Sequence, residues 1–114
     1  LMAGLLGCET VPIPTMTPTA RARIVLTQHC GTCHHPDVFW AQPAAMAVFD
    51  LGRPDWDHAM TDAQREDCVP RLAERQTMTD DELQALLPAP DAPVPPRPTD
   101  ADVRVLEEFA KQAR

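Results

Sequence analysis

The 114-residue sequence contains no tyrosine and few other aromatic residues, with three phenylalanines and two tryptophans. No stretch approaches the 18 or more apolar residues that a membrane-spanning helix requires, and no stretch forms a convincing β-strand pattern. Basic residues are also scarce, because 10 Lys and Arg stand against 17 Asp and Glu, which gives a net charge of −7. Such a chain lacks the basic face that nucleic acid phosphates demand, so nucleic acid is excluded as a partner.

The chain is instead rich in proline, with 13 residues that break it into short helices. Four threonines occupy the positions of helix caps, and two of them begin capping boxes. We therefore predict a single all-α domain over residues 18–114. The expected helices span residues 18–30, 43–49, 62–76, 79–87 and 99–112. Pro70 is expected to kink or divide the third helix, and the prolines of residues 88–98 form a stiff connector.

The sequence Cys30-Gly31-Thr32-Cys33-His34 has the C-x-x-C-H pattern of covalent haem attachment. Two thiols three positions apart on a helical turn reach the two vinyl groups along one edge of a porphyrin and form thioethers. His34 then meets the iron as the proximal ligand. A small core that is poor in aromatic residues also suits a large, flat, apolar cofactor. The motif predicts one covalent haem c.

The same cysteines allow two alternatives to haem attachment, a redox pair and a zinc site. A thioredoxin-like redox pair is expected near a βαβ pattern, which is missing here. A zinc site would need Cys30 and Cys33 with two of His34, His35, His58 or Cys68. Structural zinc sites usually pair one close couple of ligands with a second close couple, whereas His58 and Cys68 stand alone. Haem attachment is therefore favoured over both.

With a helix that leads into C-x-x-C-H, short helices in the middle and an amphipathic last helix, residues 18–112 resemble a monohaem class I cytochrome c. The resemblance implies that the first and last helices cross beside the haem, which would pair Ile24 and Val25 with Leu106 and Phe109. Leu26 completes the expected apolar side of the first helix. Arg21 and Arg23 are expected to face solvent.

The sixth iron ligand is less clearly marked, because these cytochromes often carry Met-Pro there and no Met of this chain precedes proline. Met78 is our first candidate, since it lies 44 residues after His34 (78 − 34), at a joint between two helices. Met60 and His58 are alternatives, and so is an open site. Cys68 is expected to be a buried free thiol and not an iron ligand.

Several aromatic side chains leave two possibilities each. Phe39 and Trp40 lie in a predicted loop after the motif, where they either cover a cofactor edge or belong to the core. Trp56 either donates its indole N–H to a haem propionate or packs over the core.

Residues 1–8 are apolar and end in Leu5-Leu6-Gly7-Cys8, which resembles the lipobox of a bacterial lipoprotein. The resemblance implies cleavage before Cys8 and lipidation of that cysteine. Residues 1–7 would then be a signal-peptide remnant, and residues 8–17 a proline-containing tether. It also implies a periplasmic protein that a lipid holds on a membrane, which suits haem attachment outside the cytoplasm.

The leading functional hypothesis is therefore a periplasmic electron carrier that uses one covalent haem. The acidic chain favours a redox partner with a basic docking surface. A haem-based sensor or ligand-binding module is the first alternative, and a haem-bearing accessory subunit of a larger oxidoreductase is the second. An independent enzyme is not expected, because no acid/base constellation accompanies the motif.

Overall fold

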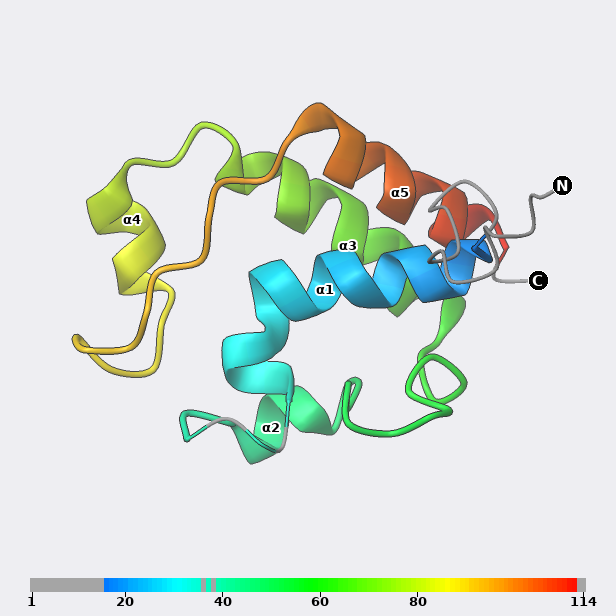
Figure 1. Cartoon of the computed structure of the whole chain (residues 1–114), viewed down its shortest axis with the longest axis horizontal. Coiled ribbons are helices and arrows are strands. Elements are labelled where there is room, and N and C mark those ends of the chain that lie inside the picture. Colours follow the sequence, from blue (N-terminus) through cyan, green and yellow to red (C-terminus); the bar gives the residue numbers. More distant parts are fainter. Residues whose placement is uncertain (1–15, 36, 38, 113–114) are drawn as a thin grey trace, which may run out of the picture.

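The computed structural model describes residues 16–35, 37 and 39–112, and within these it contains five α-helices and no strand. The helices are α1 (Pro18–His34), α2 (Pro43–Met46), α3 (Asp62–Arg75), α4 (Asp80–Ala85) and α5 (Asp100–Lys111). The all-α prediction is confirmed. Figure 1 shows α1, α3 and α5 close together, whereas α4 and the connector that follows it extend to one side.

Threonine caps begin four of the helices, as the sequence predicts. The Thr17 side chain accepts a hydrogen bond from the Ala20 amide (3.0 Å), and Pro18 occupies the first turn. Reciprocal capping boxes begin the other three helices, and they pair Thr61 with Gln64, Thr79 with Glu82, and Thr99 with Asp102.

The ends of two helices differ from those predicted. Pro70, which the sequence predicts to kink or divide the third helix, lies inside α3 and does not divide it. The first helix continues past Cys30 to His34, because the chain keeps helical hydrogen bonding there: the His35 amide donates to the Gly31 carbonyl (3.1 Å). His35 itself is extended, as expected for a residue before proline. The short helix predicted for residues 43–49 ends earlier, at Met46.

The hydrophobic core lies where α1, α3 and α5 meet. Leu26 of α1, Leu72 of α3, and Leu106 and Phe109 of α5 are buried there together. The first and last helices therefore pack against each other, as expected. Trp56 belongs to this core, because it is buried and stacks on the Phe109 ring with centroids 5.3 Å apart. Of its two interpretations, the structure supports packing over the core.

Some surface expectations are corrected. Ile24 does not join Val25 in the core, because it points outward and is 49% exposed. Arg23 does not simply face solvent, since it donates a hydrogen bond to the Leu51 carbonyl, and Arg21 is also partly covered. Phe39 is 89% exposed and lies outside the core. None of the helices described is long and apolar enough to cross a bilayer.

Candidate functional site

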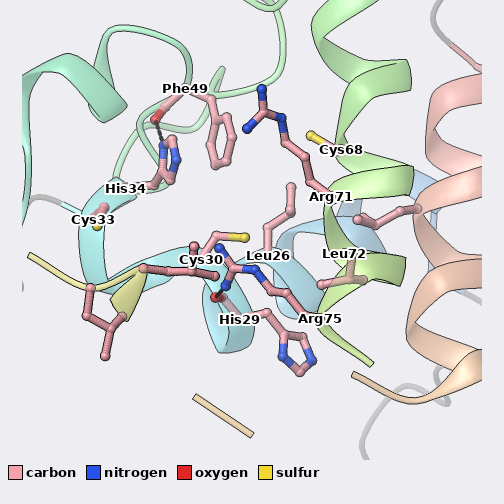
Figure 2. A pocket seen from close by; sticks show the side chains of 13 residues that line it. Leu26, His29, Cys30, Cys33, His34, Phe49, Cys68, Arg71, Leu72 and Arg75 are labelled. Atoms are coloured by element: carbon pink, nitrogen blue, oxygen red, sulfur yellow. Dashed lines mark hydrogen bonds between the residues drawn. The ribbon is translucent and has the colours of Figure 1, made fainter. Parts of the chain in front are cut away.

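A cavity of about 160 Å³ lies between the C-terminal half of α1 and the facing side of α3 (Figure 2). Its walls come from α1, the loop after α2, α3, the end of α4 and α5. The lining residues are Leu26, His29, Cys30, Cys33, His34, Phe49, Cys68, Arg71, Leu72, Arg75, Leu86, Leu87 and Leu106. Six of these residues are leucines or phenylalanine, so the cavity combines apolar walls with thiols, imidazoles and guanidinium groups.

The helical continuation of α1 is what brings the motif to the cavity. Cys33 and His34 follow Cys30 by three and four positions, and side chains at this spacing share one face of a helix. All three line the cavity. The structure therefore places the three predicted attachment residues together. It does so because α1 continues to His34, one turn beyond the predicted end of the first helix.

The His34 imidazole is held in a defined orientation by Phe49. Its Nδ1 lies 3.1 Å from the Phe49 carbonyl oxygen, and the two rings stack with centroids 3.8 Å apart and planes 5° from parallel. Because a carbonyl only accepts, Nδ1 carries the hydrogen and the lone pair is on Nε2. Burial lowers the pKa of His34, which favours the neutral ring that a metal requires.

The two motif thiols are shielded from water to different extents, and burial raises the pKa of both Cys30 and Cys33. The Arg75 guanidinium acts in the opposite direction on both thiols. It donates to the His29 carbonyl over 2.9 Å and so connects α3 to α1 beside the motif. Arg71 lines the cavity one turn earlier on α3 and is also paired with Asp67.

His29, which also lines the cavity, is already engaged elsewhere. Its Nε2 lies 3.0 Å from an Asp102 carboxylate oxygen, and its Nδ1 lies 3.0 Å from the Pro96 carbonyl oxygen. Both neighbours are acceptors, so both ring nitrogens are satisfied only when both carry hydrogen. This arrangement ties α1 to the connector and to α5, and it occupies both ring nitrogens of His29.

The predicted sixth ligands are not brought to this cavity. Met78 is absent from its lining, and its carbonyl accepts hydrogen bonds from Arg97. Met60 is buried in the hydrophobic core. The His58 side chain is 76% exposed. Met78 remains a prediction that this geometry does not support.

Cys68 is the sulfur that the structure does bring to the cavity. Burial, with smaller contributions from Cys30 and Asp67, raises its pKa to about 11, so the free thiol is neutral at physiological pH. The expectation of a shielded free thiol agrees with this environment. The sequence did not predict that Cys68 lines the same cavity as the residues of the motif.

Sequence reasoning also missed Arg71 and Arg75, although a signal for them exists. Counting from Cys68, the cavity residues of α3 recur at positions i, i+3, i+4 and i+7, which mark one face of a helix. That face mixes a thiol, an aliphatic side chain and two guanidinium groups, so a search for apolar periodicity passes over it. Phe49 was assigned only to a helix and not to the site.

Some predictions lie outside these observations. Cys8 and the segments 1–7 and 8–15 belong to residues that the structure does not describe. Within the described part of the chain, no group of three or more His, Cys, Asp or Glu side chains is arranged to hold a metal ion by itself. Comparisons with protein-family models, curated proteins and solved structures find no match for this chain.

Proposed function

We propose that the chain is a monohaem c-type cytochrome domain that carries electrons. Cys30 and Cys33 would form the two thioethers, and His34 would be the proximal iron ligand. One observation carries the proposal: all three side chains line one largely apolar cavity, where Phe49 holds the imidazole as the tautomer with Nε2 available.

The remaining walls of the cavity suit the same cofactor. Leucines from α1, α3, α5 and the end of α4 offer apolar contacts to the faces of a porphyrin, and their burial of its surface would contribute to holding it. Arg71 and Arg75 bring two positive charges to a cavity that would receive a ligand with two carboxylates. The donor set and the apolar wall therefore fit haem.

A porphyrin is larger than this cavity, so the haem-bound form must differ from the structure described here. The wall most able to yield is the one formed by Leu86 and Leu87, because α4 and its connector extend away from the three packed helices (Figure 1). We expect this segment to move when haem is attached, while the core of α1, α3 and α5 stays in place.

When bound, haem supplies a one-electron couple between ferrous and ferric iron. The protein's own part is to fix the His34 ring through the Phe49 carbonyl and to exclude water with its apolar wall. Both effects tune the reduction potential of a haem. Little rearrangement of the three-helix core is required of such a carrier.

The location and the partner belong to the same proposal and rest on the sequence. Cleavage before Cys8, lipidation of this residue and attachment to a bacterial membrane would place the domain in the periplasm on a short tether. The net charge of −7 favours a redox partner whose docking surface is basic. Association should then weaken as salt is raised.

A ligand-binding or sensor module is the second candidate, because the cavity lining contains no methionine. Carbon monoxide separates the two functions. It should leave the ferrous spectrum of a carrier with a firmly held sixth ligand largely unchanged at neutral pH, and it should shift the spectrum of a protein with an open or easily displaced site.

The attachment is tested by expressing the full chain with a bacterial haem-attachment system. Wild type should keep peroxidase staining on a denaturing gel, with the mass of the polypeptide increased by one haem. The double variant Cys30→Ala/Cys33→Ala should lose both signals. Cys68→Ala, which removes a cavity thiol outside the motif, is the matched control and should keep them. A wild type without covalent haem would refute the proposed function.

A further inference from the structure

We infer that Cys68 is the sixth ligand, so that a thiolate from α3 binds the iron opposite His34. This inference rests on the proposed function, since it needs the haem that Cys30 and Cys33 would attach. It departs from the sequence analysis, which favours Met78 as the ligand and expects Cys68 to be a free thiol and not an iron ligand.

The first support is the space that Cys68 shares with His34. Besides the main cavity, a second cavity is lined by both residues, and the two cavities also share Phe49 and Arg71. In Figure 2 the Phe49 ring lies between His34 and the α3 side chains Cys68 and Arg71. Both cavities are therefore lined by the imidazole of α1 and the thiol of α3.

The second support is that Cys68 lies across the cavity from the C-x-x-C-H motif. Cys30 and Cys68 both line the main cavity. Cys68 and Cys30 come from opposite walls, since α3 forms one side of the cavity and the motif of α1 forms the other. A ligand attached at the motif would thus have Cys68 on its far side.

The third support is that the other candidate ligands among the described residues lie elsewhere or already have partners. His29 has acceptors at both ring nitrogens, His58 is largely exposed and Met60 is packed in the core. Met78 does not line the cavity. Of the sulfur and imidazole side chains that line the cavity, Cys68 alone is outside the motif and free of such engagement.

The ligation step balances without any redox reagent. The S–H bond of Cys68 breaks, its proton goes to solvent, and the sulfur lone pair forms a bond to ferric iron, whose oxidation state does not change. Arg71 and Arg75 face the same cavity and partly offset the negative charge of the thiolate. An anionic ligand favours ferric over ferrous iron, so the reduction potential should be lower than with a thioether ligand.

The experiment compares holoprotein spectra of wild type with Cys68→Ala, Cys68→Met and Met78→Ala. Wild type should give the low-spin ferric absorption and electron paramagnetic resonance signals of histidine–thiolate ligation. Cys68→Ala should lose them, and Met78→Ala should keep them. Cys68→Met should gain the weak band near the red end of the ferric spectrum that marks a thioether bound to iron, with a higher reduction potential than wild type.

Val69→Ala, the next residue on α3, is the matched control and should keep the wild-type signals. A wild-type ferric spectrum that survives in Cys68→Ala, or a thioether band that vanishes in Met78→Ala, would overturn the inference and leave the proposed function standing. Failure to attach haem in wild type would instead overturn both. If Cys68→Ala is poorly folded, the gain of the thioether band in Cys68→Met decides, because its absence in a folded holoprotein contradicts the assignment.

Discussion

The two halves of α1 face different surroundings. Its first half places Ala22, Val25 and Leu26 against a closed apolar core, where each side chain is buried by others of the same kind. Its second half places thiols and an imidazole against a cavity that also contains two arginines. The first half is packed within the core, whereas the second half borders an open cavity.

The largest effect should come from removing an aromatic anchor of the closed core. Phe109 is fully buried and lies beneath Trp56 and the Arg65 guanidinium. Replacing it with alanine removes this packing and leaves a void, so Phe109→Ala should lower the free energy of unfolding by about 3–5 kcal/mol. Urea denaturation measures the change. Leu86→Ala, on the cavity wall, is the contrast and should cost much less, because Leu86 is 47% exposed.

The second prediction concerns the bond that joins the two walls of the cavity. Arg75→Gln should lower the free energy of unfolding by about 1–3 kcal/mol, because the charged hydrogen bond to the His29 carbonyl is lost. Thermal or urea unfolding of the apoprotein measures it. Arg71→Gln is the matched control one turn away, and it should cost about 0.5 kcal/mol or less, since its ion pair with Asp67 is exposed. Equal losses in the two variants would refute this role of Arg75.

Acid should weaken the contact between α1 and α5. Desolvation of Asp102 opposes its ionisation, but hydrogen bonds from Thr99 and His29 outweigh it and lower the pKa of Asp102 below its usual 3.8. A carboxylate with a depressed folded-state pKa adds stability above its unfolded pKa, and this contribution disappears as pH falls through the folded pKa. The stability difference between wild type and Asp102→Asn should therefore be largest near neutral pH and shrink below about pH 4.

Unfolding curves at several pH values test this expectation. Asp91→Asn, at an exposed position of the connector, is a control for the general effect of removing one carboxylate. A stability difference for Asp102→Asn that stays constant down to pH 2 would show that its carboxylate is not held by these bonds.

The sequence was sufficient for features that depend on local chemistry. Threonine caps and prolines predicted where the helices begin, and the C-x-x-C-H motif singled out Cys30, Cys33 and His34, which line one cavity. Features that depend on the packing of distant segments were missed. The role of Arg75 requires α3 to lie beside α1, and the placement of Cys68 requires knowing which face of α3 meets the motif. Neither can be read from a window of neighbouring residues.

The α3 helix also shows how Pro70 fits inside a helix without dividing it. Proline lacks only its own amide donor and disfavours the conformation before it, and a helix capped by Thr61 and packed in the core tolerates that local loss. The tertiary contacts of Leu72, two residues later, supply stabilisation that a propensity argument does not count.

The smallest expected effect is that of Ile24→Ala, and its comparison with Leu26→Ala separates the outward face of the first half of α1 from the buried face. Leu26 is 1% exposed and Ile24 is 49% exposed, although they are two residues apart on one helix. Leu26→Ala should lower the free energy of unfolding by about 2–5 kcal/mol. Ile24→Ala should change it by only about 0.5 kcal/mol or less, because little burial is lost and alanine has the higher helix propensity. A loss in Ile24→Ala comparable to that in Leu26→Ala would restore the pairing of Ile24 with α5 that the family resemblance implies.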